Sequence, residues 1–424
     1  MLGFRAWVAA GLMCALTGCS EDEPEFVPAS LPECPDHDYS TCDIRAVSCQ
    51  KRLLALTVCV YGTESIPSVP VQLISEQELR DALEAELADE QAMLTEDNVV
   101  ATDLMESALV DLRLTKVGGL SGEAIIDDYV ATLAGVYLDP ENGVVLIDHG
   151  RPQNDPEANA LLVHELVHAL QDADYDLQTW VEPFLSSTDS LLAARSVTEG
   201  QATYYGFRVG LAMLGHATDA IDYEQTLLNL TRDLDAVARE DPSPYTRSAA
   251  TFPYGYGGLS AYRAWLSEGQ GYERALIETP PLSTQEVLHA ALPDAKPEVE
   301  RVELTAPAHT GDYALLDEDV LGGWLLGVML TKHGVIAATA ESLSATWSGD
   351  HLWLYRDSAD NRGWLWELQL GDESAAAEVM GALNGELPDT VHLEHSGVRL
   401  FIASGSDGAP QELLDAGSAF LAGE

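Results

Sequence analysis

The chain has 424 residues, of which 46% are hydrophobic, and it contains 8 Trp and 15 Tyr residues. This composition excludes a disordered or low-complexity protein, and the length exceeds the roughly 250 to 300 residues at which a single core usually stops growing. Because 70 acidic residues face only 21 basic ones, for a formal net charge of -49, the surface lacks the basic face that nucleic acid requires, and no nucleic-acid partner is expected.

The first predicted element is an export signal at residues 1–18. A single positive charge precedes an apolar run over residues 6–16, which is too short to span a bilayer comfortably. The run ends in Leu-Thr-Gly-Cys at 16–19, which resembles the lipobox of bacterial lipoproteins. This resemblance implies cleavage before Cys19, membrane attachment through a lipid on its sulfur and, with Ser20 next, sorting to the outer membrane, on its periplasmic or surface face. An ordinary secretory signal with an incidental cysteine is the alternative.

Four cysteines follow within a short segment. Cys34, Cys42, Cys49 and Cys59 form an even set in an exported segment, which predicts two disulfides and leaves three pairings open. A zinc knot is the rival interpretation, but the C-x2-C pairs of such knots are missing. We therefore expect residues 19–66 to form a lipidated, Cys-rich stalk that is dispensable for zinc binding elsewhere in the chain.

A compact domain is expected over residues 67–302. Residues 70–74 are typical of a strand, and residues 76–94 carry apolar side chains at helical intervals behind Ser75, which can cap the helix. Two short apolar runs within residues 134–147 enclose a segment that contains Pro, Asn and Gly. This pattern predicts a β-hairpin.

The next predicted helix contains the sequence His-Glu-Leu-Val-His. It begins after Asp155, a typical N-cap, with proline in the first helical position. Because residues four apart lie on one helix face, the imidazoles of His164 and His168 can bind one Zn²⁺, while the carboxylate of Glu165 can take a proton from water. The alternative is a solvated helix face, which agrees poorly with the Leu, Val and Ala residues around the motif.

A third protein ligand is expected from a second helix, because catalytic zinc sites usually have three. Residues 187–189 can begin this helix, which carries the candidate ligand Glu199. A surface glutamate on an amphipathic helix is the alternative. Gly200 and Ala202 would leave room for the first helix, and the Thr203 hydroxyl could bond the ligating carboxylate.

Further side chains are candidates for supporting roles. Asp172, one turn beyond His168, either orients a histidine or closes the helix. The candidates for an electrophile that stabilises the oxyanion of an attacked carbonyl are Tyr254 and Tyr256, in a predicted glycine-rich turn, and His289, on a helix begun by Ser283. Tyr254 and His289 are favoured. The alternative is that the tyrosine packs in the core and the histidine bonds the backbone.

The remainder of the chain, residues 303–424, predicts a small α+β unit. Its expected elements are, in order, a helix at 315–330, strands at 347–355 and 363–370, a helix at 373–383 and a strand near 398–402. Alternating Trp residues on the two longer strands favour burial against a helix, with a binding groove as the alternative.

The zinc-helix motif, followed by Glu-Gly-x-Ala at 199–202, resembles the glutamate-type zincins, a group of metallopeptidases. Three further blocks resemble a group of uncharacterised bacterial exported proteins, and they are Gly135-Val136-Tyr137, Pro253-Tyr254-Gly255 and the string from Pro280 to His289. The similarity covers about residues 70 to 290. It departs from the pattern at Val136, where an aromatic is common, and at Gln201, where an acid is common.

The resemblance implies a zincin-like domain, mostly helical with a small mixed sheet, so the whole chain is expected to be α+β. It also implies an edge strand, in the 134–147 hairpin, that can pair with an extended substrate. The expected function is zinc-dependent hydrolysis of a peptide or protein substrate, with His164, His168 and Glu199 as ligands and Glu165 as general base. An inert binding or scaffold lipoprotein and a non-peptidase amidase are the alternatives. Substrate preference and oligomeric state stay open.

Overall fold

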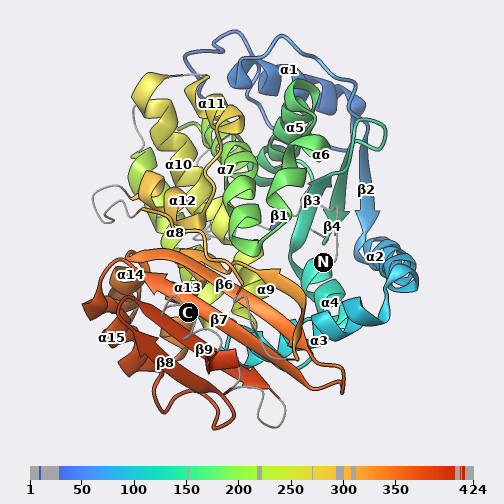
Figure 1. The fold of residues 1–424 in the computed structure, drawn as a ribbon. Helices are drawn as coiled ribbons and strands as arrows, with labels where there is room; N and C mark the ends of the chain where they lie inside the picture. Colours follow the sequence, from blue (N-terminus) through green and yellow to red (C-terminus); the bar gives the residue numbers. More distant parts are fainter. Residues whose placement is uncertain are drawn as a thin grey trace.

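The computed structural model describes residues 9–10, 28–150, 152–216, 222–269, 271–292, 300–306, 312–405, 411 and 413–415. Cys19 and most of the predicted export signal lie outside these residues. The fold is α+β, as expected, with a helical body, a small mixed sheet beside it and a larger antiparallel sheet across its lower end in Figure 1. Among the described helices, none combines the length and the apolar character that crossing a bilayer needs.

The small sheet has the strand order β1-β3-β4-β2. β3 (Leu133–Tyr137) and β4 (Val144–Asp148) form the predicted antiparallel hairpin. The predicted strand β2 (Val71–Ser75) runs parallel to β4, and the two-residue β1 (Ala9–Ala10) pairs antiparallel with the outer edge of β3. β3 is therefore the outermost of the three longer strands.

The helices begin where the sequence provides caps. Ser75 and Glu78 form the capping box of α2, Asp155 caps α5, and Ser187 caps α7, as predicted. The helices of the body are α1 (Val47–Tyr61), α2 (Glu76–Met93), α3 (Glu96–Asp111), α4 (Gly122–Thr132), α5 (Pro156–Tyr175), α6 (Leu177–Val181), the 3₁₀ helix η1 (Glu182–Phe184), α7 (Thr188–Met213), α8 (Tyr223–Glu240), α9 (Pro244–Ala249), α10 (Phe252–Glu268), α11 (Tyr272–Glu278) and α12 (Thr284–Ala291).

The central helix α7 packs against both α5 and α10, and nearly all of its side chains are buried (Figure 1). Glycines allow the close approach on both sides. A Cβ on Gly206 would lie 2.9 Å from the backbone oxygen of Ala160 on α5, and a Cβ on Gly200 would clash with the backbone of Gly257 on α10. Gly200 therefore makes room for α10, and the prediction that it makes room for α5 is wrong, because Gly206 has that role.

The N-terminal segment contains the two predicted disulfides, which join Cys34 to Cys59 and Cys42 to Cys49. Asn159 of α5 holds this segment in place. Its side-chain oxygen accepts the Cys42 N–H at 3.0 Å, and its amide group donates to the Cys42 carbonyl at 2.8 Å. The cross-linked segment is thus bonded directly to the helix that carries the histidine motif.

The same segment shares a hydrophobic core with α5 and α7. Leu53 and Leu56 of α1 are fully buried in one cluster with Leu166 of α5. The backbone N–H of Ala29 donates to the carbonyl of Ala212, near the end of α7, at 2.8 Å. Where the sequence analysis expects a stalk, the structure therefore has a segment packed on the two central helices.

The larger sheet has five antiparallel strands in the order β5-β6-β7-β9-β8. This part contains β5 (Ala314–Asp319), α13 (Gly322–Lys332), α14 (Ala337–Ser344), β6 (Trp347–Arg356), β7 (Arg362–Leu370), α15 (Glu373–Leu383), β8 (His392–Ser396) and β9 (Arg399–Gly405). The strands β6, β7 and β9 and the helix α15 confirm the predictions. The predicted helix at 315–330 is wrong in its first part, because β5 pairs with β6. The helix α13 begins only at Gly322, whose φ of 86° marks a sharp change of backbone direction.

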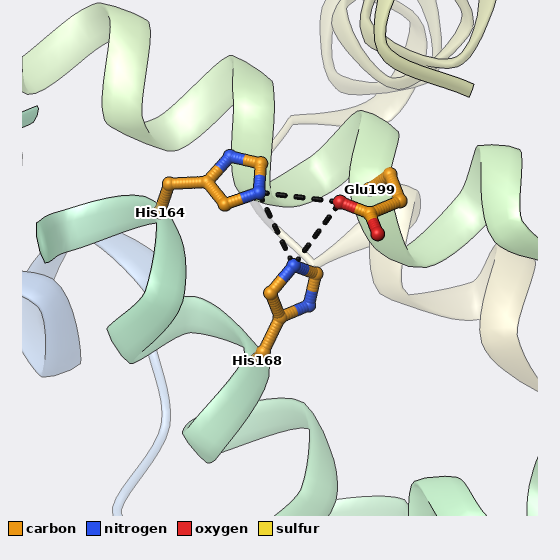
Figure 2. A group of neighbouring side chains, drawn as sticks. All are labelled: His164, His168 and Glu199. Carbon is orange, nitrogen blue, oxygen red and sulfur yellow. Dashed lines mark hydrogen bonds and ion pairs between the residues drawn. The ribbon is translucent and has the colours of Figure 1, made fainter. Parts of the chain in front are cut away.

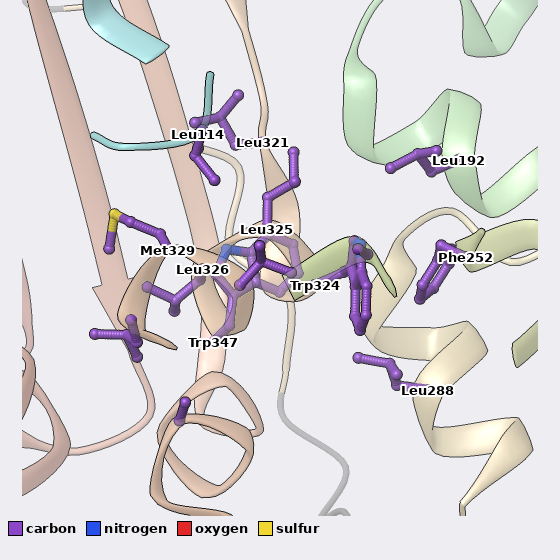
Figure 3. Close-up of a cluster of buried hydrophobic side chains, with 14 of the residues drawn as sticks. Leu114, Leu192, Phe252, Leu288, Leu321, Trp324, Leu325, Leu326, Met329 and Trp347 are labelled. Atoms are coloured by element: carbon purple, nitrogen blue, oxygen red, sulfur yellow. The ribbon is translucent and has the colours of Figure 1, made fainter. Parts of the chain in front are cut away.

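A large hydrophobic cluster joins this sheet to the helical body (Figure 3). Trp324 of α13 packs against Phe252 of α10 with 5.1 Å between ring centres, and Leu192 of α7 belongs to the same cluster. The buried Trp side chains of the two long strands are Trp347, Trp353, Trp364 and Trp366. These residues belong to the core, as the sequence analysis favours, and the C-terminal part supports α7 directly.

Candidate metal centre

Three side chains from two helices meet where α5 packs on α7. His164 and His168 lie one turn apart on α5, and Glu199 extends towards them from α7 (Figure 2). The two Nε2 atoms are 3.2 Å apart, and each lies 3.2 Å from Oε2 of Glu199. All three residues are buried. The structure therefore brings together the three residues that the sequence predicts as ligands.

Gln171 fixes the protonation of His168. The amide group of Gln171 donates to the backbone oxygen of Thr198 at 3.1 Å and to the side-chain oxygen of Gln201 at 3.0 Å, so its own oxygen faces Nδ1 of His168, at 2.9 Å. Because a carbonyl oxygen only accepts, Nδ1 of His168 carries the proton. In neutral His168, Nε2 then carries no proton, and its lone pair faces Nε2 of His164 and Oε2 of Glu199.

The group fits a metal ion. Three electron-pair donors that face one another at 3.2 Å repel unless a positive charge lies between them. Ligands of a tetrahedral zinc ion, each about 2.0 to 2.1 Å from the metal, lie about 3.3 Å from one another. Imidazole and carboxylate are also the donor types of catalytic zinc sites. Within the described part of the chain, this is the one group of three that could hold a metal ion.

Burial and the opposite charges set the pKa values in the group. Burial acts to raise the pKa of Glu199, but the two histidines and Arg195 outweigh it and hold that pKa well below its usual range. Burial lowers the pKa of His164, whereas the Glu199 carboxylate raises the pKa of His168 in spite of burial. Glu199 is therefore charged throughout the physiological pH range, as a carboxylate ligand would need to be.

Glu165 lies beside this group without belonging to it. Its side chain is fully buried and packs against β3, where a Cβ on Gly135 would lie 3.0 Å from Oε1. Burial raises the pKa of Glu165 to about 8. Because glycine has no side chain, Gly135 leaves room for the Glu165 carboxylate between α5 and the sheet.

Tyr254 lies on α10 and not in a turn. Its ring stacks on His164, with ring centres 5.9 Å apart and an angle of 17° between the planes. The predicted glycine-rich turn is wrong because its glycines serve helix packing, and a Cβ on Gly257 would clash with the backbone of Ser196 on α7. Burial and the nearby Glu199 carboxylate raise the pKa of Tyr254 well above its usual range, so the phenol stays neutral.

Two predicted supporting residues have other roles. Asp172 accepts hydrogen bonds from the Tyr137 hydroxyl and from the Leu177 N–H, both at 2.8 Å, so it closes the end of α5 and does not orient a histidine. The Thr203 hydroxyl makes no hydrogen bond with the residues that the structure describes. The predicted hydrogen bond from Thr203 to Glu199 is therefore absent from the described part of the chain.

His289, the second candidate electrophile, lies partly buried on α12. The helix begins as predicted, because the Ser283 side chain accepts the backbone N–H of Glu286. A contact between His289 and a substrate stays a prediction.

Two residues of the site, Gln171 and Arg195, were not predicted from the sequence. Nη2 of Arg195 lies 3.5 Å from Oε1 of Glu199, the oxygen that does not face the histidines. Helical spacing is the signal that could have found both residues. Gln171 follows His168 by three positions, and Arg195 precedes Glu199 by four, so each lies on the same helix face as a ligand.

Comparisons with models of known protein families, with curated proteins and with solved structures found no match.

Proposed function

We propose that this protein is a zinc-dependent hydrolase, and more specifically a metallopeptidase. The observation that carries the proposal is the buried triangle of His164, His168 and Glu199, with the carboxylate of Glu165 held beside it. Zinc held by these three side chains would lower the pKa of water from about 15.7 towards 7 and would polarise a carbonyl group.

Glu165 supplies the proton transfer in this proposal. Burial raises its pKa to about 8, and the positive charge of a zinc ion beside it would lower that pKa again, so the side chain would be a carboxylate near neutral pH. As water attacks the carbonyl carbon of the scissile bond, a C–O bond forms, the carbonyl π electrons move to its oxygen, and the Glu165 carboxylate accepts a proton from the water. When the C–N bond breaks, that proton passes to the leaving nitrogen. The products are a carboxylic acid and an amine, so one water molecule is consumed for each bond cleaved.

A peptide substrate is supported by the position of β3 at the margin of its sheet. Of the described strands, only the two-residue β1 pairs with the outer edge of β3. We propose that β1 is removed with the export signal, so the mature protein would offer this edge to another extended chain. A peptide paired there would pass Gly135, against which Glu165 packs.

We also propose that the enzyme is exported and is anchored to the outer membrane through a lipid on Cys19. The two disulfides support export, because disulfides persist mainly in oxidising compartments. The formal net charge of -49 supports an anchored body that stays soluble above the membrane.

Glu165→Gln tests the proposed reaction. The substitution keeps the size of the side chain but removes its basicity, so cleavage should slow by about 10² to 10⁴, while zinc content and thermal stability stay close to those of the wild type. Cleavage is measured with a broad peptide library near neutral pH, with and without a chelator. Zinc is located by anomalous scattering at the zinc edge.

Glu182→Gln is the matched control, because Glu182 is exposed on η1, and it should cleave like the wild type. If Glu165→Gln cleaves as fast as the wild type, the proton-transfer role is wrong. If the wild type binds zinc tightly but cleaves no peptide of the library, the inert binding lipoprotein is the better description.

A further inference from the structure

Arg195 places a positive charge beside the ligand group, although metal binding does not require one there. The residue lies one turn before Glu199 on α7, with Nη2 3.5 Å from Oε1 of the carboxylate. A positive charge so close to a metal site repels the metal ion, and this repulsion is strong where burial weakens solvent screening. Arg195 helps to keep Glu199 charged, but a bound metal ion would do the same, so in the metal-bound protein Arg195 is free to serve another role.

Arg195 has the largest exposed fraction of the four side chains in this group. Its side chain is 12% exposed, compared with 8% for His164, 2% for His168 and 0% for Glu199. Part of the Arg195 side chain is therefore in contact with solvent, whereas Glu199 is fully buried.

Most of the hydrogen-bonding capacity of Arg195 is available. A guanidinium has five N–H donors, and among the hydrogen bonds of the described residues Arg195 makes one, the long contact with Glu199. The phenols of Tyr129 on α4 and Tyr254 on α10 are nearby. Burial raises the pKa of both phenols, so neither provides a negative charge that would neutralise Arg195.

We propose that Arg195 binds the carbonyl oxygen of the scissile bond and stabilises the negative charge that develops on it. This role, which rests on the proposed hydrolysis, is the one that the sequence analysis sought in Tyr254 or His289. The fork of the guanidinium suits it, because one N–H can stay on Glu199 while others point to the substrate oxygen.

Arg195→Met tests the proposal in the zinc-loaded protein by three measurements. Zinc affinity, from competition with a chromophoric chelator, should stay the same or increase, because a repelling charge is lost. Methylphosphonate, a tetrahedral anion that resembles the attacked carbonyl, should bind at least about tenfold more weakly by calorimetry, and kcat should fall by about 10² to 10³ with little change in KM. Arg195→Lys keeps the charge but not the forked guanidinium. Its methylphosphonate affinity and its kcat should therefore lie between those of Arg195→Met and those of the wild type.

Arg208→Met is the matched control. Arg208 is also a buried arginine of α7, and it pairs with Glu33 at 2.5 Å. Its loss should lower thermal stability but leave zinc affinity and methylphosphonate binding unchanged.

Three results would overturn the proposal. The first is weaker zinc binding in Arg195→Met, which would mean that Arg195 only holds Glu199 in place. The second is equal methylphosphonate affinity in the variant and the wild type, and the third is a wild type that does not bind methylphosphonate. Anion binding needs no turnover, so it tests Arg195 even if the peptide library contains no substrate. A failure of the proposed peptidase function can therefore be distinguished from a failure of the role proposed for Arg195.

Discussion

Gln171 contributes to the candidate metal centre without offering a metal ligand. Its side-chain oxygen accepts from Nδ1 of His168, while its amide group is held by the backbone of Thr198 and by Gln201. The side chain therefore cannot rotate without losing two hydrogen bonds across the interface between α5 and α7. As a result, one ring orientation of His168 is held, the one that directs Nε2 towards Glu199.

Gln171→Leu should weaken zinc binding by about 10- to 100-fold, because the partners that orient ligating histidines usually contribute that much. The comparison is with Gln77→Leu, since Gln77 bonds only to Asp81 on the exposed face of α2 among the described contacts. Competition with a chelator measures both affinities. Equal zinc affinity in the two variants would mean that Gln171 does not position His168.

At the scale of single residues, the sequence predicts what one helix determines by itself. His164, Glu165 and His168 could be predicted because the spacing of a helix fixes their common face. Glu199 was predicted from the need for a third ligand. Arg195 was missed although it lies four positions before Glu199, because the spacing shows only that the two share a helix face. That this face meets α5 depends on how two helices cross, and the close approach at glycines such as Gly206 is not visible in a local pattern.

At the scale of the elements, the N-terminal end of α7 is fixed by hydrogen bonds to two buried carboxylates, those of Asp189 and Asp319. Asp189 accepts hydrogen bonds from the N–H and the hydroxyl of Thr284, at 2.8 and 2.6 Å. Asp319 of β5 accepts the N–H of Thr188 at 2.7 Å. Since α7 also carries Glu199, these contacts connect the antiparallel sheet to the metal centre through one helix.

Asp189→Asn should change how stability depends on pH. Burial raises the pKa of Asp189 to about 7, and nearby Asp350 adds to the shift, while the Thr284 hydrogen bonds oppose it. The unfolded chain keeps a pKa of about 3.9, so the folded state binds the extra proton between these values. Stability from this group is therefore full below about pH 4 and is lost as the pH rises through about 7.

Asparagine cannot ionise, so Asp189→Asn should raise the free energy of unfolding by about 4 kcal/mol at pH 8 but by only about 1 kcal/mol at pH 4.5. Urea denaturation at the two pH values measures the difference. Asp103→Asn, at an exposed position on α3, should show no such dependence. An equal effect of Asp189→Asn at both pH values would contradict the predicted ionisation.

Elements with a cap in the sequence were predicted well, and elements that depend on distant partners were not. α2, α5 and α7 begin at side chains that bond their own first turn. In contrast, the glycines at the start of α10 disfavour a helix, and packing on α7 and α8 overrides that tendency. β5 was missed because its pairing with β6 spans more than thirty residues.

At the scale of the whole molecule, the N-terminal segment packs in one hydrophobic core with α5 and α7. Its two disulfides are therefore expected to stabilise the whole protein and not a separate stalk. The Cys34–Cys59 bridge spans 25 residues and the Cys42–Cys49 bridge spans 7. Loss of the first, by Cys34→Ser with Cys59→Ser, should reduce the free energy of unfolding by about 3 kcal/mol, and loss of the second by less. Urea denaturation of the metal-free protein measures both. Unchanged stability in the first double variant would support a stalk independent of α5.

The hydrogen bond between Ala29 and Ala212 fixes the point at which a lipid tether would meet the body. The ten residue-to-residue steps from Cys19 to Ala29 can extend at most about 35 Å, and the thirteen helical steps from Glu199 to Ala212 span about 20 Å. An anchored enzyme of this kind would work within about 55 Å of the bilayer, from the sum of these two lengths. Distance from the membrane would then act on substrate choice before chemistry does: proteins embedded in the same bilayer, or resting on it, would stay within range, whereas freely diffusing ones would be cleaved only when they enter this layer.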